Sequence, residues 1–156
     1  MAEAVLSDMV RALNELYRLS GSARVHADTV RSTGVTITQT GLRFLSLIAD
    51  SPRISASDLA LALDVSQPTA SRVLQQLEND AYVVRHQSDS DGRLSHYVTS
   101  AKGRRALATV HRYHVDRLAY ALHDSEPAYQ QAIAQAVTEL VARLTEAAEG
   151  TRERTA

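Results

Sequence analysis

Five polar side chains lie close together near the middle of the chain, where an amphipathic helix is expected. They are Gln67, Thr69, Ser71, Arg72 and Gln75. Glutamine can pair through two hydrogen bonds with adenine and arginine with guanine, so a helix presenting them can read base edges in the major groove of DNA. A polar helix face taken alone is more often only solvated, so this interpretation depends on the elements around the helix.

An arginine follows a tight-turn sequence shortly downstream. The stretch Ser88-Asp89-Ser90-Asp91-Gly92 is a turn cluster that ends in the Asp-Gly pair typical of β-hairpins. Arg93 is therefore expected at the tip of a hairpin, where a long cation can enter the narrow, electronegative minor groove. Asp91 can hold that guanidinium through a paired hydrogen bond. The alternative is that Arg93 is an ordinary surface arginine.

Hydrophobic spacing and capping residues predict the elements that must position these side chains. Apolar residues at three- and four-residue intervals predict a first helix from about Ala4 to about Val30. A second helix is expected to begin at Thr38 and to end before Ser51-Pro52, because the residue before a proline disfavours helix. Its buried face is expected to carry Leu42, Leu45, Ile48 and Ala49.

Two shorter helices follow, separated by a turn of three residues. Ser55 and Asp58 fit a capping box at the start of the first, whose inward residues are expected to be Leu59, Ala62 and Leu63. Ser66 caps the second, and Pro68 falls in its first turn, where proline is tolerated. The inward residues of this second helix are expected to be Ala70, Val73, Leu74 and Leu77.

The period then changes to that of β-structure before returning to helix. Short strands are expected at 82–85 and 94–98, a long helix from Ser100 to about Leu122, and a last helix from 125–127 onward. Helix, short turn, helix and hairpin in this order make a winged helix-turn-helix. The predicted fold is therefore mostly α with a small β-wing.

Composition limits the function less than these motifs do. The chain has no cysteine, which excludes disulfides and thiolate metal sites, and its formal net charge is −1. Residues 53–105 carry seven basic and six acidic residues, so charge alone would not indicate DNA binding. No basic start followed by an apolar run, and no long uncharged apolar stretch, is present. A cytoplasmic protein with no membrane partner is expected.

An ordered set of short motifs runs through residues 37–103. They are Ser57-Asp58-Leu59-Ala60, Ser66-x-x-Thr69-Ala70-Ser71-Arg72, Leu77-Glu78, Tyr82-Val83-x-Arg85, Asp91-x-Arg93 and Ser100-x-x-Gly103. Taken together they resemble the MarR family of bacterial winged helix-turn-helix transcriptional regulators. The chain departs from the family pattern in three places: Ser71 stands where threonine is common, Thr99-Ser100 replaces Leu-Thr, and Asn79-Asp80-Ala81 replaces a small loop ending in glycine.

The resemblance extends to the helices on both sides of the motifs and implies a homodimer. It assigns residues 1–34 and 104–150 to a helical dimerisation region, 35–103 to the DNA-binding domain, and 151–156 to a flexible tail. The alternative is that the apolar stripes of the outer helices pack within one chain. A two-fold dimer places its recognition helices about 34–36 Å apart on palindromic double-stranded DNA. Because the family mostly represses, a repressor is expected.

The family also implies a small aromatic or phenolic effector, bound between the dimerisation helices and the DNA-binding domain. The candidate ligand-binding residues are Tyr17, Arg24, Phe44, Tyr113 and Tyr120, each of which can equally be plain core or surface. Zinc-sensing relatives make a metal-responsive regulator an alternative. Its candidate ligands are His26, His111, His114 and His123, although helix histidines are usually polar surface, and no metal or cofactor is predicted.

The sequence carries no sign of catalysis. It contains no Gly-x-Ser-x-Gly, no His-Glu-x-x-His and no glycine-rich phosphate loop, so an enzyme is not expected. A winged helix that binds another protein instead of DNA remains the main alternative. Salt dependence separates the two, because DNA binding weakens steeply as counterions are released.

Overall fold

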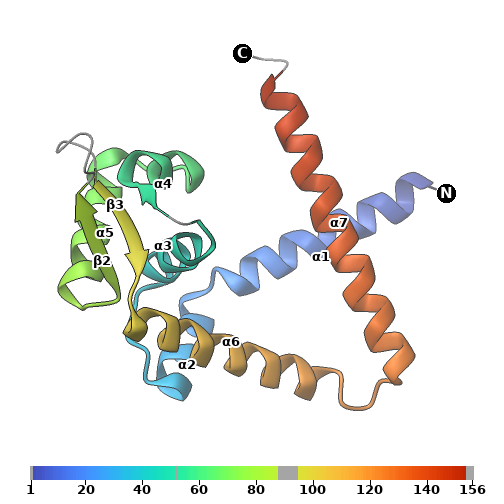
Figure 1. The fold of residues 1–156 in the computed structure, drawn as a ribbon. Helices are drawn as coiled ribbons and strands as arrows, with labels where there is room; N and C mark the ends of the chain where they lie inside the picture. Colours follow the sequence, from blue (N-terminus) through green and yellow to red (C-terminus); the bar gives the residue numbers. More distant parts are fainter. Residues whose placement is uncertain (1, 52, 88–94, 154–156) are drawn as a thin grey trace. The chain divides into compact units, whose positions relative to one another are not determined.

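The computed structural model describes residues 2–51, 53–87 and 95–153. The chain divides into two compact units, residues 1–114 and residues 115–156, with the boundary inside a long helix. The elements are α1 (Ala2–Ser20), α2 (Ala23–Thr33), α3 (Gln39–Asp50), β1 (Ile54–Ser55), α4 (Ala56–Ala62), α5 (Gln67–Asn79), β2 (Val83–Gln87), β3 (Ser95–Thr99), α6 (Ala101–Ala121) and α7 (Pro127–Glu153). A mostly helical fold with a small antiparallel sheet is confirmed (Figure 1).

The first expected helix is in fact two helices, so that prediction was wrong. α1 ends at Ser20, and Ser22 begins α2 by accepting a hydrogen bond from the backbone N–H of Val25 at 3.2 Å. A glycine followed by a serine favours this break, because glycine is a poor helix former and serine is a strong N-cap. The side-chain amide of Gln39 donates to the carbonyl of Ser20 at 2.8 Å, which connects the end of α1 to the start of α3.

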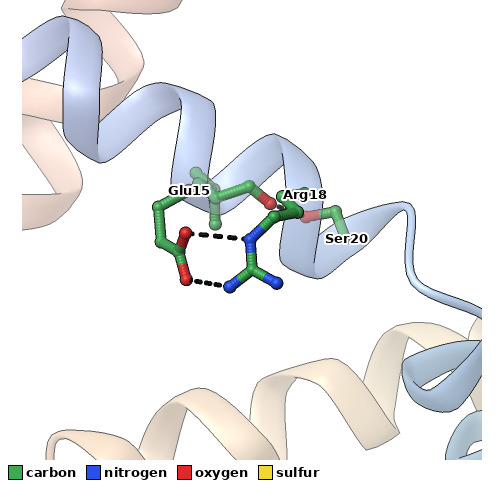
Figure 2. Close-up of polar contacts among 4 residues, drawn as sticks. Glu15, Arg18 and Ser20 are labelled. Atoms are coloured by element: carbon green, nitrogen blue, oxygen red, sulfur yellow. Dashed lines mark hydrogen bonds and ion pairs between the residues drawn. The ribbon is translucent and has the colours of Figure 1, made fainter.

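The last turn of α1 carries a local ion pair (Figure 2). The Nε of Arg18 donates to Glu15 Oε2 at 3.0 Å, and a guanidinium N–H donates to the other carboxylate oxygen. This hydrogen bonding lowers the pKa of Glu15 and raises that of Arg18. Both groups are solvent-exposed, so the pair orders the helix surface and adds little to stability.

The predicted helix starts at Thr38, Ser55, Ser66 and Ser100 are confirmed. The first three side chains accept hydrogen bonds from the backbone N–H three residues later, and Ser55 forms a reciprocal capping box with Asp58. Ser100 Oγ accepts from the N–H of Gly103 at 3.0 Å. α3 ends at Asp50, ahead of Ser51-Pro52 as expected. These signals are local, which is why they are readable from sequence.

The sheet has three antiparallel strands in the order β1-β3-β2. β2 and β3 pair as a hairpin, with Val83 opposite Thr99 and Gln87 opposite Ser95. β2 begins at Val83, one residue later than predicted, and the described part of β3 begins at Ser95. β1 was not predicted: two residues carry no periodic signal, and Ile54 is extended because it pairs with Tyr97.

The core of the first unit lies between α3, α4, α5 and the sheet. Its fully buried large side chains are Phe44, Leu45, Leu59 and Leu74. Two expected core residues, Ala49 and Ala62, are exposed, whereas Ala60 is buried. α4 is only seven residues long, and its packing against α5 and β1 turns the Leu59–Ala60 edge inward.

The outer helices are less covered by their own chain. α1 exposes Leu6, Val10, Leu13 and Leu16, and α7 exposes Val137, Val141 and Leu144. Helix α7 continues to Glu153, so it includes the first three residues of the expected tail. None of the helices in the described ranges combines the length and the apolar character needed to cross a bilayer.

Candidate nucleic-acid interface

Helix α5 separates an apolar face from a polar face. Ala70, Leu74 and Leu77 are buried in the core. On the other side, all five residues predicted to contact DNA, namely Gln67, Thr69, Ser71, Arg72 and Gln75, are exposed. The inward residues Ala70, Leu74 and Leu77 therefore agree with the prediction, and Val73 is half-buried.

The N-terminus of α5 is fixed by its own side chains. Ser66 Oγ accepts from the backbone N–H of Thr69 at 3.3 Å and is 2.8 Å from Thr69 Oγ1. Thr69 was predicted as a base reader, but in this structure its hydroxyl is engaged with the helix cap. Pro68 has no backbone N–H, so in the first turn it leaves no hydrogen-bond donor unpaired. The first turn is thus preorganised by residues that also lie on the exposed surface.

The exposed residues of α5 fall on two flanks. Residues four apart share a helix face, so Gln67, Ser71 and Gln75 form one row. Ser71 and Gln75 line a pocket of about 400 Å³, whereas Arg72 lines a separate pocket of about 370 Å³ beside α3. The five predicted residues therefore share a helix surface without forming a single cluster.

The pocket of about 400 Å³, called here the wing-side pocket, joins α5 to the hairpin. Its lining residues are Ser55, Ala56, Ser57, Ser71, Gln75, Glu78, Arg85, Ser95 and Tyr97. Arg85 from β2 thus shares a surface with Ser71 and Gln75. Sequence reasoning placed Arg85 in a motif and did not assign it to the site. Strand alternation gives the missing signal, because Arg85 lies two residues after the buried Val83.

Tyr97 forms the apolar base of this pocket. It lies on β3, opposite Arg85 and Ile54, and is buried. Burial raises the pKa of its phenol, with Arg85 opposing the shift and Glu78 adding to it. The phenol therefore stays neutral across the physiological range, and Arg85 is the cationic side chain at the pocket.

Asp91 and Arg93 lie outside the described residues, between the two strands of the hairpin. The structure describes the strands up to Gln87 and from Ser95 onward, in register. The roles of Arg93 in the minor groove and of Asp91 in holding its guanidinium therefore stay predictions from the sequence.

The five candidate ligand-binding residues lie in different environments within their own units. Phe44 is 0% exposed and belongs to the core, whereas Tyr17 and Tyr120 are 84% and 80% exposed. Arg24 is exposed and Tyr113 is half-buried. Sequence periodicity could not separate these environments, because an aromatic residue on an amphipathic helix fits each of them.

A different pocket lies beside α2, α3 and α6 within the first unit. It has a volume of about 370 Å³ and brings together Arg43, His26, His111 and His114, with Val25, Leu107 and Val110 as its apolar lining. We call it the histidine pocket. None of the five candidate ligand-binding residues lines it.

Three of the four histidines considered as metal ligands line the histidine pocket, and His123 does not. His123 contacts the carbonyl of Tyr120 through Nδ1 at 2.8 Å and Asp124 through Nε2 at 3.1 Å. Over the described ranges, no three histidine or carboxylate side chains are arranged to hold a metal ion.

Comparison with known proteins agrees with this geometry. Residues 33–94 match the model of the MarR family. No curated relative matches the chain by sequence. The solved structure of a MarR family protein from Bacillus stearothermophilus has a TM-score of 0.79, with 14% identity over 93% of this chain and 99% of that chain.

Two further solved structures are similar along nearly their whole length. The transcriptional regulator Tm0710 from Thermotoga maritima has a TM-score of 0.68 and 19% identity, covering 92% of this chain and 96% of that one. Streptococcus pneumoniae FabT, solved in complex with DNA, has a TM-score of 0.63 and 18% identity, covering 94% and 99%. Identities this low show a shared fold. Residues 33–94 thus resemble the MarR family in sequence, and the chain shares its fold with a solved transcriptional regulator and a solved MarR family protein.

Proposed function

We propose that this chain is a DNA-binding repressor that acts as a homodimer on a palindromic operator. The observation that carries the proposal is helix α5, which buries Ala70, Leu74 and Leu77 and presents a hydrogen-bonding face beside the hairpin. A similar fold occurs in FabT, which was solved in complex with DNA.

In this proposal the row Gln67, Ser71 and Gln75 faces the bases of the major groove, with Arg72 on the adjoining flank. Amide and guanidinium groups can pair bidentately with adenine and guanine. Thr69 contributes less to base reading than its position suggests, because its hydroxyl already contacts Ser66. Arg85 joins the contact surface as a phosphate ligand.

The exposed apolar residues of α1 and α7 support the homodimer. Exposed apolar stripes on a helix, as on each of these two, often mark a protein–protein contact. The dimerisation region would comprise residues 1–34 and 104–150 around a DNA-binding domain at 35–103. One chain has a mass of 17.0 kDa. Sedimentation analysis at micromolar concentration should then give twice this mass.

Selection of bound sequences from a random DNA pool at two salt concentrations tests the function. We expect an enriched inverted repeat with half-sites about one helical turn apart, and weaker binding at the higher salt as counterions are released. A folded dimer that enriches no sequence, with or without zinc, would instead support a winged helix that binds protein. Enrichment only with zinc would favour the metal-responsive alternative.

Replacing Arg93 with alanine is expected to weaken binding to the selected operator by about 1–3 kcal/mol without changing the fold. The reason is the loss of a cation proposed to enter the minor groove. The dissociation constant can be measured by fluorescence anisotropy with the selected duplex. Arg152→Ala, which removes the same charge at a position outside the proposed dimerisation and DNA-binding regions, serves as the control and should bind like the wild type. Equal affinities for Arg93→Ala and wild type would contradict the wing assignment.

The histidine pocket also has the chemistry of a small-molecule effector site. Arg43 offers a cation for a carboxylate, three imidazoles offer further donors, and Leu107 and Val110 supply apolar contacts. An aromatic or phenolic acid has the matching chemistry. Such a ligand would release DNA only if it binds the DNA-free arrangement of the dimer more tightly.

A further inference from the structure

The corner that follows the recognition helix is attached to the start of α6 through three successive carbonyl groups. Lys102 Nζ donates to the carbonyl of Asp80 at 2.7 Å. Ser100 Oγ donates to the carbonyl of Ala81 at 2.7 Å, and the backbone N–H of Ser100 donates to the carbonyl of Tyr82 at 3.0 Å. We call this arrangement the corner clamp.

The clamp holds the carbonyl groups of a turn whose amides already bond to carbonyls near the end of α5. Asp80 is the C-cap of α5, and Ala81 has a φ of 58°, in the left-handed region that an alanine adopts only when its surroundings require it. Carbonyls at a helix C-terminus carry partial negative charge, so an ammonium group is favoured there. Lys102, the only lysine of the chain, supplies that ammonium group.

Lys102 makes a second contact with the same corner. Its Nζ lies 4.3 Å from the centre of the Tyr82 ring, within the range of a cation–π interaction. Tyr82 is itself buried in the core, beneath the turn. A single side chain of α6 therefore contacts the turn both at a backbone carbonyl and at a buried aromatic ring.

Lys102 contacts the corner at the C-terminal end of α5, so a small tilt at this end displaces the DNA-reading side chains at the other end. Helix α5 has 13 residues. At 1.5 Å per residue it is about 20 Å long, so a tilt of about 10° at its C-terminal end moves its N-terminal end by about 3 Å. Gln67 lies at this N-terminal end. A displacement of about 3 Å equals the length of a hydrogen bond, so it would break a hydrogen bond that Gln67 makes to a base.

We propose that Lys102 is a positioning residue for operator recognition, which fixes the end of the recognition helix to α6 without contacting DNA itself. The proposal rests on the DNA-binding function proposed above. α6 continues into the second unit, so the clamp also gives a route by which a displacement of α6 reaches the base-reading side chains. Ser100 shares the clamp but also caps α6, which makes Lys102 the cleaner residue to test.

The test compares Lys102→Met, which keeps an apolar stem and removes the ammonium, with Lys102→Arg, which keeps a cationic donor. Arg105→Met removes the same charge from α6 and serves as the control. Dissociation constants are measured for the selected operator and for an unrelated duplex at several salt concentrations. We expect Lys102→Met to bind the operator about 5–10-fold more weakly, with the unrelated duplex and the salt slope unchanged, and Lys102→Arg to recover most of the loss.

The salt slope separates positioning from direct contact. A lysine that touches a phosphate would lower the slope by about one and weaken both duplexes equally when removed, and this result would overturn the proposal. So would operator affinity equal to wild type, even if the thermal stability fell. If the wild type itself shows no sequence preference, the proposed function fails and the DNA role of Lys102 fails with it.

Hydrogen exchange on the free protein tests the clamp independently of DNA. Lys102→Met should speed exchange of the amides of Asp80, Ala81 and Tyr82, which hydrogen-bond to carbonyls near the end of α5. Lys102→Arg should restore slow exchange. Unchanged exchange in Lys102→Met would show that the lysine does not hold the corner, and would overturn the proposal whatever the DNA measurements give.

Discussion

Replacing Phe44 with alanine should lower the free energy of unfolding by about 3–5 kcal/mol, the usual range for removing a buried phenyl ring. Phe44 is among the largest side chains that are fully buried, and it packs in the core formed by α3, α4 and α5. The loss combines the transfer free energy of the ring with the cavity it leaves. Urea unfolding followed by circular dichroism, at one fixed protein concentration, measures it.

The same experiment decides between the core and a ligand-binding role for Phe44. Phe44→Leu retains most of the buried volume and should lose much less stability than Phe44→Ala. Leu61→Ala truncates an apolar side chain of α4 that is 79% exposed, so it controls for truncation without burial and should stay within about 0.5 kcal/mol of wild type. A Phe44→Ala protein as stable as wild type would contradict the burial of this ring.

Replacing Gly103 with alanine should lower the free energy of unfolding by about 3 kcal/mol, because the added methyl group overpacks the site. The new Cβ would lie 2.2 Å from the carbonyl oxygen of Tyr82 and 2.8 Å from Thr99 Cγ2. An alanine ordinarily gains about 1 kcal/mol over glycine inside a helix, so the packing cost must exceed this gain. The backbone oxygen cannot move aside as a flexible side chain could, since it accepts a hydrogen bond from Ser100.

Gly34→Ala is the matched control. A Cβ at Gly34 would meet no atom within 4 Å, but its φ of 69° is unfavourable for alanine. We expect a loss of about 1 kcal/mol there, from backbone strain alone. If Gly103→Ala proved no less stable than Gly34→Ala, the close approach of α6 to Tyr82 would be wrong. Both variants use the same urea measurement.

The position of Gly103 also explains why the motif Ser100-x-x-Gly103 ends in glycine, which the sequence pattern alone did not explain. Ser100-x-x-Gly103 looks like a helix start, with serine as the cap. The structure adds that the glycine lets α6 approach the corner after α5, where Ser100 and Lys102 hold three carbonyls. Spacing along the chain predicted the cap, but it contained no information about the residue that the glycine faces.

Features that depend only on neighbours along the chain could be predicted from the sequence. Helix starts at Thr38, Ser55 and Ser66 are set by a side chain and an amide three residues apart, and these starts were predicted correctly. The ordered motifs likewise predicted the resemblance to the MarR family, whose model matches residues 33–94. Gly21 and Ser22 are also a local signal for the break between α1 and α2. The apolar spacing continues across them, and for this reason it predicts a single helix.

Packing between distant segments, in contrast, sets which of their residues share a surface. Arg85 joins Ser71 and Gln75 because the hairpin folds back beside α5. His26 meets His111 and His114, about 85 positions later, because α2 and α6 border one pocket. Phe44 is core because α5 and β3 pack against α3. Helical periodicity gives the direction in which a side chain points, whereas the element it meets there is set by packing across the whole fold.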